Sequence, residues 1–527
     1  MSEPIYRRPR GRAGLPRAIA VIAAAVSLAG AAHAYNLDTA NPAVQQALDP
    51  AQVRRALPAF EQYARDVLAR SGLPGMAVGI WVDGQVVLAR GYGTRDTCTG
   101  APVDADTLFP LASVSKVLAG ASVAALVGEG KLDWDSKVSD LAAGIRFHDP
   151  YVTSEMTLRD LLSQRTGYAP FYGEDLEVIF GYSRAEVFRR LRHLRPVSAF
   201  RTQYAYSNWN LTLAGEVAAQ SAGMPWEDLV RRKIIEPAGM RRTVVTHQEY
   251  LAEPNRSAAH EIIEGRTVAT DALSRHAQAP AGGVYSTLND MLRFVALEID
   301  AGRLDGRQVV DETAMLETQT AQTIISPAFP ALHYGLGLEV RNDHGRKLLE
   351  HNGAFEEGIN TRVSFLPAQR LGIVILTNSL PMGVPDALEY KLMALLFADR
   401  PDRDIWPELR DKWRQALRQL MDRPGQLHGA PPAPAVSPPD IARYVGTYGH
   451  PYYGNIVIER AASGLSMKAG AAPLRDMTHW QGATFRVPAL QDAALNFVPG
   501  TGDQVHALTL SGLEDMPDAL FLRQTQP

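Results

Sequence analysis

Hydrophobic and polar positions follow two different periods along the first four hundred residues, which predicts a mixture of helices and strands. Apolar side chains recur at helical spacing over residues 58–70, and Pro58 suits the first helical position. Two strand-like runs follow at residues 76–82 and 85–89. Asp83-Gly84 between them is a typical β-hairpin turn. This part of the chain is therefore expected to begin with a helix and an antiparallel strand pair.

Residues 113–127 are rich in alanine and apolar on all sides, as in a helix buried inside a domain. A second strand pair is expected at 363–366 and 372–377. Further helices are predicted at 158–162, 184–190, 211–220 and 288–297. Strand pairs at both ends with helices between them favour an α+β fold with an antiparallel sheet over a doubly wound parallel one.

The chain divides near residue 430, where proline becomes dense and charge disappears. We expect a large main domain at 35–425, a Pro-rich linker at 426–439 and a small all-β domain at 440–527. Short strand-like runs separated by turns, such as 454–458, predict a β-barrel or a sandwich in the last segment.

The first residues resemble an export signal. Basic residues between Arg7 and Arg17 precede an apolar stretch at 18–32, and Ala32-His33-Ala34 offers the small residues of a cleavage site. The apolar stretch is shorter than the roughly 20 residues of a membrane span. We therefore expect a signal peptide at 1–34 and a periplasmic or secreted protein with no stable span after cleavage. The export route stays open.

Composition excludes several classes of function. The net charge of −4 and the lack of a basic run in the predicted domains argue against nucleic acid as a partner. A single cysteine, Cys98, rules out an internal disulfide and a cysteine-rich metal site. No metal ion and no cofactor is implied.

The strongest chemical signal is the spacing of Ser113 and Lys116 at the start of the predicted buried helix. Residues three apart lie on one helical face, so the hydroxyl and the amine are expected to meet. A helix N-terminus favours an anion there, and burial would lower the pKa of Lys116 until its amine can accept the serine proton. A surface serine and a solvated lysine are the alternative, but a lysine in an otherwise apolar segment is usually paired or functional.

Two more triplets follow in the chain, Tyr206-Ser-Asn208 before a predicted helix and His351-Asn-Gly353 after a strand-like run. With Ser-x-x-Lys, they resemble the motif set of serine β-lactamases and penicillin-binding proteins. The Tyr-x-Asn form is similar to the branch that contains class C β-lactamases, D-stereospecific peptidases and carboxylesterases.

The resemblance extends from about residue 60 to residue 396, because connecting segments also match in order. These segments are 130–133, 157–162 with 166–167, 236–240, 281–286 with 290, and 371–378. It implies a β-lactamase/transpeptidase-like α+β fold, an antiparallel sheet flanked by helices plus an all-helical lobe. Tyr444-Val-Gly-Thr-Tyr448 resembles the opening of a small C-terminal barrel domain in some peptidase relatives, which would cover the site or mediate oligomers.

The resemblance also assigns roles to these residues. Ser113 would be the nucleophile, and Lys116 and Tyr206 would share its proton, with the identity of the general base left open. Substrate would be bound by Asn208, His351 and Gly353. The backbone N–H groups of Ser113 and Ala354 would form the oxyanion hole.

Simpler structural readings stand beside these roles. Tyr206 could be a core tyrosine, Asn208 a helix cap, and His351 a histidine that merely packs at a strand. Dedicated β-lactamases have lysine in place of His351, and an uncharged imidazole holds a β-lactam carboxylate less firmly than an ammonium does.

The sequence therefore predicts a secreted serine hydrolase that cleaves amide or ester bonds through an acyl-enzyme. Its substrates would be peptides with D-residues or carboxylic esters. A β-lactamase is one alternative. A penicillin-binding receptor that deacylates slowly is another, since turnover and trapping need the same nucleophile.

Overall fold

The structure is a computed structural model, and it describes most of the chain from residue 45 to residue 524. The gaps within that range are 264–265, 271–273, 275, 356, 381, 399–401, 422–424, 435, 439, 463 and 501–503. The predicted signal peptide at 1–34 lies outside the described residues. Within the described part, no helix has both the length and the apolar character needed to cross a bilayer.

A nine-stranded sheet forms the centre of the main body, with the order β10-β11-β12-β13-β14-β15-β1-β2-β3. All neighbouring strands in it are antiparallel, which confirms the predicted α+β fold. The strands are β1 (Gly75–Val82), β2 (Gln85–Asp96), β3 (Ala101–Pro102), β10 (Thr323–Ser326), β11 (Phe329–Tyr334), β12 (Glu339–Asp343), β13 (Arg346–Phe355), β14 (Ile359–Leu366) and β15 (Leu371–Thr377). The predicted hairpin turn is present, with positive φ at both Asp83 and Gly84, as a type I′ turn requires.

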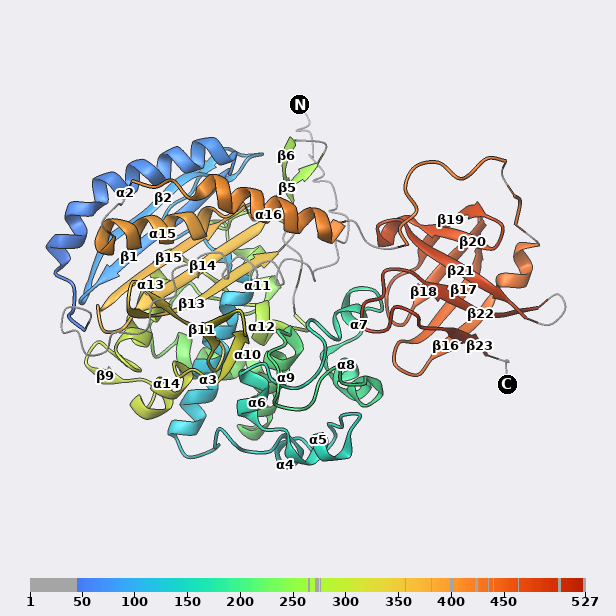
Figure 1. The fold of residues 1–527 in the computed structure, drawn as a ribbon, viewed down its shortest axis with the longest axis horizontal. Coiled ribbons are helices and arrows are strands. Elements are labelled where there is room, and N and C mark those ends of the chain that lie inside the picture. Colours follow the sequence, from blue (N-terminus) through green and yellow to red (C-terminus); the bar gives the residue numbers. More distant parts are fainter. Residues whose placement is uncertain are drawn as a thin grey trace.

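One face of the sheet is covered by α2 (Pro50–Ser71), α15 (Val384–Phe397) and α16 (Trp406–Met421), drawn across the top of the body in Figure 1. The helix α2 begins eight residues before the predicted start at Pro58. Asp49 caps it by accepting a hydrogen bond from the Ala51 N–H at 2.8 Å. Pro50 then occupies the first turn, so Pro58 lies inside the helix.

The opposite face packs against α13 (Leu288–Ile299) and the buried helix α3 (Ser115–Gly128), with a lobe of short helices beyond them. The lobe contains α4 (Val138–Leu141), α5 (Pro150–Glu155), α6 (Leu158–Leu162), α7 (Glu174–Val178), α8 (Arg184–Arg190), α9 (Asn208–Ser221), α10 (Trp226–Val230), α11 (His247–Ala252), α12 (Ala279–Gly282) and α14 (Glu312–Thr318). Alternate residues of β1 supply the two cores: Val78 and Ile80 face α2, whereas Ala77 and Trp81 face the other side.

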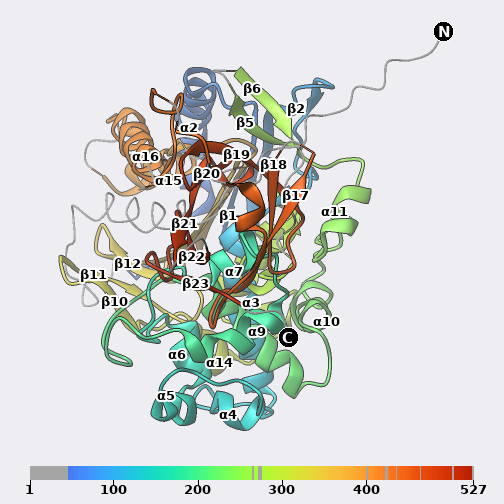
Figure 2. The same cartoon turned by 90° about the vertical axis from the view of Figure 1, so that its right-hand side faces the viewer.

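The C-terminal region is a closed eight-stranded barrel, which confirms the predicted small all-β fold. Its strands are β16 (Gly446–His450), β17 (Gly454–Ala461), β18 (Gly464–Ala469), β19 (Arg475–Gln481), β20 (Thr484–Val487), β21 (Ala493–Pro499), β22 (Val505–Leu510) and β23 (Phe521–Arg523). The barrel lies beside the helical lobe at α7 and α8 (Figures 1 and 2). The domain boundaries at 34, 425 and 439 stay predictions.

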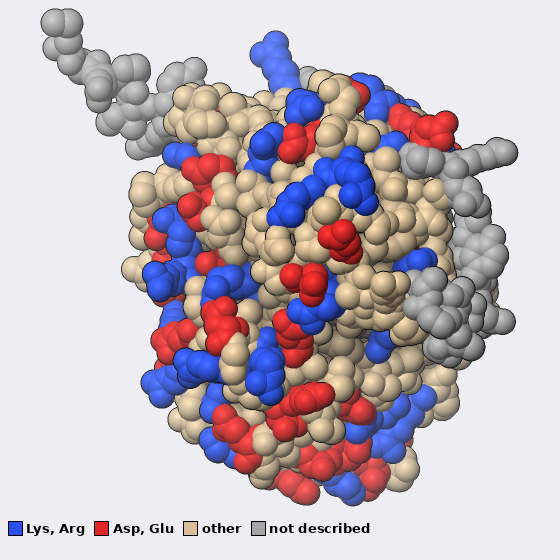
Figure 3. Space-filling model, turned by 90° about the vertical axis from the view of Figure 1, so that its left-hand side faces the viewer, with Lys and Arg blue, Asp and Glu red and all other residues tan. Residues whose placement is uncertain are grey.

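Charged side chains are mixed on the body's surface. On the face drawn in Figure 3, Lys and Arg alternate with Asp and Glu, as the small net charge predicts. This face carries no broad patch of one sign.

Candidate active site

Ser113 lies in a tight turn directly before the buried helix. The helix α3 begins at Ser115, and a 3-10 turn, η3 (Ala112–Val114), contains Ser113. The predicted helix start at 113 is therefore two residues early. Ala112 has a φ of +48°, a left-handed conformation that a residue with a side chain adopts only when its surroundings hold it there. Ser113 is 8% exposed.

Lys116 is fully buried one turn into this segment, and its Nζ has three oxygen partners. It lies 2.9 Å from Ser113 Oγ, 2.7 Å from Asn208 Oδ1 and 3.0 Å from the carbonyl oxygen of Ala281. A neutral amine has two N–H donors and one lone pair. If Asn208 and Ala281 accept the two N–H bonds, the lone pair remains for the hydroxyl proton of Ser113. The predicted meeting of serine and lysine is present in the structure.

Burial lowers the pKa of Lys116 well below its usual value, and the carboxylate of Glu174 opposes this shift. Desolvation disfavours the ammonium because the surroundings cannot replace its hydration. A lysine in this environment is an effective proton acceptor for a neighbouring hydroxyl.

Tyr206 precedes α9 and lies against the lysine, with Lys116 Nζ 4.8 Å from the centre of its ring. Burial raises the pKa of Tyr206, although a hydrogen bond with Ser113 acts in the other direction. The phenol therefore stays protonated and is a weaker base than the buried amine. Its ring also packs against Phe171 and Tyr334, so Tyr206 serves the aromatic core as well as contacting the nucleophile.

Asn208 is the first residue of α9, and the helix cap is its neighbour Ser207. The Ser207 hydroxyl accepts the Trp209 N–H at 3.2 Å, so the reading of Asn208 as a mere cap is wrong. The Asn208 amide instead joins two buried ionisable groups. Its oxygen accepts from Lys116, and its Nδ2 donates to Glu174 Oε1 at 2.9 Å.

His351 lies in the middle of β13, and both of its ring nitrogens have partners within the protein. Nδ1 is 2.6 Å from the carbonyl oxygen of Asn352, so it carries the proton and donates it. Nε2 then accepts from the hydroxyl of Tyr334 at 3.0 Å. Burial and the nearby Lys116 lower the pKa of His351 to about 3. The imidazole is therefore neutral at physiological pH.

Gly353 brings β13 directly against the nucleophile turn. A Cβ added to it would lie 2.2 Å from the carbonyl oxygen of Leu111 and 3.1 Å from the backbone nitrogen of Ser113. Only glycine permits this approach. Ala354 follows on the same strand, so the two N–H groups predicted for the oxyanion hole come from adjoining segments.

Sequence analysis missed three residues that hold this arrangement. Gln164 fixes the backbone at the centre of the tyrosine motif, because its Oε1 accepts from the Ser207 N–H at 3.0 Å and its Nε2 donates to the Ser207 carbonyl at 3.1 Å. Tyr334 orients His351, and Glu174 orients Asn208. No local pattern marks them, although Gln164 follows the family-like segment 157–162.

Metal binding was not predicted, and the described part of the chain contains no cluster of three or more His, Cys, Asp or Glu side chains suited to a metal ion.

Comparison with known proteins identifies the family to which the main body belongs. The family model described as Beta-lactamase matches residues 60–397. The chain belongs to the β-lactamase family. A second model, described as a domain of unknown function (DUF3471), matches residues 430–524, which is the barrel region of this β-lactamase family member.

Relatives with assigned names include hydrolases. The unguisins hydrolase of Aspergillus campestris is 24% identical over 428 residues, which is 76% of this chain and 77% of that protein. The D-aminopeptidase of Brucella anthropi is 27% identical over 305 residues, 56% of this chain and 54% of that protein. This chain thus matches about half the length of the D-aminopeptidase.

Penicillin-binding proteins are also similar. Penicillin-binding protein 4 of Amycolatopsis lactamdurans is 28% identical over 321 residues, covering 58% of this chain and 81% of that protein. The octameric penicillin-binding protein homologue from Pyrococcus abyssi has the same fold, with a TM-score of 0.59 and 19% identity, covering 86% of this chain and 98% of that chain. This β-lactamase family member is a serine hydrolase.

Proposed function

We propose that the protein is an exported hydrolase that cleaves amide or ester bonds through an acyl-enzyme on Ser113, acting on peptides with D-residues or on carboxylic esters. The observation that carries the proposal is the buried amine of Lys116, 2.9 Å from Ser113 Oγ and with a pKa well below its usual value. Export to the periplasm or the medium rests on the basic and apolar pattern of residues 1–34.

In the proposed reaction, the Lys116 amine takes the hydroxyl proton while Ser113 Oγ bonds to the substrate carbonyl carbon. The backbone N–H groups of Ser113 and Ala354 hold the negative oxygen of the tetrahedral intermediate. The C–N or C–O bond then breaks, and the Lys116 ammonium protonates the leaving amine or alkoxide. Water attacks the acyl-enzyme in the second half, and its proton passes to the amine before Ser113 Oγ leaves with a proton.

Lys116 is assigned as the general base. Tyr206 is assigned as a hydrogen-bonding partner of the Ser113 hydroxyl. This assignment rests on opposite effects of burial, which lowers the pKa of the lysine and raises that of the tyrosine. The neutral His351 supports amide or ester substrates over β-lactams as the main substrates, since it lacks the charge that holds a β-lactam carboxylate.

A slowly deacylating penicillin receptor is the second candidate, because a penicillin-binding protein is among the relatives. Both candidates are tested by incubating the protein with a p-nitrophenyl ester, a D-alanyl p-nitroanilide and a chromogenic cephalosporin. Turnover of the ester or anilide that is lost in Ser113→Ala supports the proposal.

Other outcomes overturn it. Stoichiometric labelling by benzylpenicillin without turnover of any substrate indicates the receptor. Rapid cephalosporin hydrolysis with no cleavage of the other two indicates a β-lactamase. Full turnover by Ser113→Ala removes the basis of the acyl-enzyme.

A further inference from the structure

The buried carboxylate of Glu174 is linked to the lysine through one amide. Glu174 is 1% exposed. Its Oε1 accepts from Asn208 Nδ2 at 2.9 Å, and Asn208 Oδ1 accepts from Lys116 Nζ at 2.7 Å. A carboxylate can only accept hydrogen bonds, so the Asn208 amide presents its N–H to Glu174 and is left with its oxygen facing Lys116. Rotating the Asn208 amide by half a turn would set its oxygen against the Glu174 carboxylate, so Glu174 fixes the orientation of the amide.

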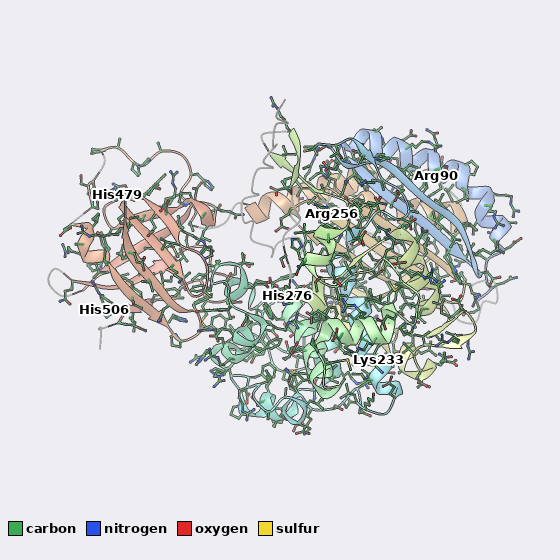
Figure 4. The ribbon with its side chains drawn as sticks, turned by 180° about the vertical axis from the view of Figure 1, so that it is seen from behind. Arg90, Lys233, Arg256, His276, His479 and His506 are labelled. Carbon is green, nitrogen blue, oxygen red and sulfur yellow. The ribbon has the colours of Figure 1, made fainter. Side chains whose placement is uncertain are left out.

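The other carboxylate oxygen is also held. Gln278 donates from Nε2 to Glu174 Oε2 at 2.7 Å. Gln278 lies two residues after His276, which Figure 4 shows near the edge of the main body that faces the barrel. Glu174 is thus fixed at both oxygens by side chains that come from distant parts of the chain.

The backbone that carries Glu174 depends on the barrel. The helix α7 has only five residues, too few to be stable without tertiary contacts. The residue before Glu174, Gly173, donates its N–H to the carboxylate of Asp515 at 3.0 Å. The residue after it, Asp175, accepts at Oδ2 from the Glu514 N–H at 2.8 Å, the Asp515 N–H at 3.1 Å and the Tyr453 hydroxyl at 3.1 Å. Barrel residues therefore hold both neighbours of Glu174.

Apolar and main-chain contacts continue this attachment beyond α7. The ring of Phe180 stacks on Tyr453 and Phe521 with centroid distances of 5.2 and 6.2 Å. Its carbonyl oxygen accepts N–H bonds from Ala471 and Ala472 at 2.9 and 3.1 Å. The apolar core of the helical lobe continues into the barrel without interruption. Contacts of this kind fix a segment as firmly as a domain core does.

We propose that the barrel is a working part of the catalytic unit: by holding α7 it positions Glu174, which orients Asn208 and so holds Lys116 against Ser113. Glu174 is a positioning residue, because it acts through Asn208. The inference rests on the proposed acyl-enzyme function. It gives the barrel a role within its own chain, distinct from covering the site or joining subunits.

The test uses the full chain and measures how fast Ser113 is acylated by a p-nitrophenyl ester in single-turnover conditions. Glu174→Gln keeps the size of the side chain and removes its charge. Asp515→Ala removes the barrel's acceptor for the Gly173 N–H. The matched control is Asp518→Ala, an exposed carboxylate in the same barrel loop. Thermal unfolding and near-UV circular dichroism confirm that each variant folds.

Glu174→Gln and Asp515→Ala are expected to slow acylation about tenfold or more with KM little changed, the size typical for loss of an outer hydrogen-bond partner of a functional side chain. Asp518→Ala is expected to acylate at the wild-type rate. Wild-type rates in folded Glu174→Gln or in folded Asp515→Ala overturn the inference. Acylation that survives in Ser113→Ala overturns the proposed function instead, so the two failures are distinguishable.

A pH profile separates positioning from general damage. Tyr206 and His351 face Lys116 from the segment before α9 and from β13, and both are neutral near pH 7. Glu174 favours the ammonium, so Glu174→Gln is expected to move the acidic limb of the acylation rate to lower pH. A rate that falls equally at every pH, with no shift of the limb, overturns the positioning role.

Discussion

Replacing Gly353 by alanine tests how closely β13 must approach the nucleophile. The added Cβ would lie 2.2 Å from the Leu111 carbonyl oxygen and 2.3 Å from Thr361 Oγ1. Ordinary van der Waals contacts of a Cβ lie at 3.4–4 Å, so the strand and the Ser113 turn must separate by about 1 Å. Overpacking of this kind costs about 1–3 kcal/mol of unfolding free energy. A displacement of about 1 Å at reacting groups costs about 100-fold in rate.

The assay compares acylation by a p-nitrophenyl ester with thermal unfolding, so that activity and stability are separated. Gly91→Ala is the matched control, because its Cβ would lie 2.1 Å from the Val103 carbonyl oxygen, in the same sheet but on β2. Both variants are expected to lose similar stability. Only Gly353→Ala is expected to lose acylation in the folded protein. Equal acylation rates in the two variants would refute the view that this glycine sets the position of Ser113.

Two further predictions concern the titratable groups. Lys116→Met keeps the side-chain volume and removes the base, so the acylation rate measured by stopped flow should fall about 100- to 10,000-fold. A loss of less than about tenfold would show that another group takes the proton. The pKa of His351 is about 3 in the folded protein against 6.5 for an ordinary histidine, so the unfolded chain binds a proton that the folded protein excludes. Stability contributed by neutral His351 is therefore present above pH 6.5 and falls by about 1.4 kcal/mol per pH unit between about 6.5 and 3. The difference in Tm between wild type and His351→Gln should become smaller as the pH falls from about 6.5 to 3. A Tm difference that does not change with pH would contradict the conclusion that His351 is neutral in the folded protein.

Local chemistry made part of the site predictable. The Ser113–Lys116 pair depends on a spacing of three residues at a helix start, and the pair still meets although the helix begins at Ser115. Helices with their own caps, such as α6 and α8, have the predicted bounds. Tyr206 and Asn208 were assigned to the site only because the motifs occur in the order typical of the family. Local sequence rules cannot predict their long-range contacts with Lys116.

The supporting residues were not predictable because their roles arise from contacts between distant segments. Glu174 lies in a run with Asp175 and Glu177, and such acidic runs are usually solvated faces. Its burial depends on Gln278, 104 positions away, and on a barrel more than 250 residues further along the chain. The strands β10–β12 were missed as well. Their short segments carry no clear alternation, and pairing with β13 is what makes them part of the sheet.

One partner of Lys116 belongs to the main chain. A carbonyl oxygen is present at position 281 whichever residue occupies it. This bond therefore does not depend on a side chain that one substitution could remove, unlike the bonds of Lys116 to Ser113 and Asn208. Lys116 thus keeps one main-chain anchor in the site when either of those two side chains is replaced.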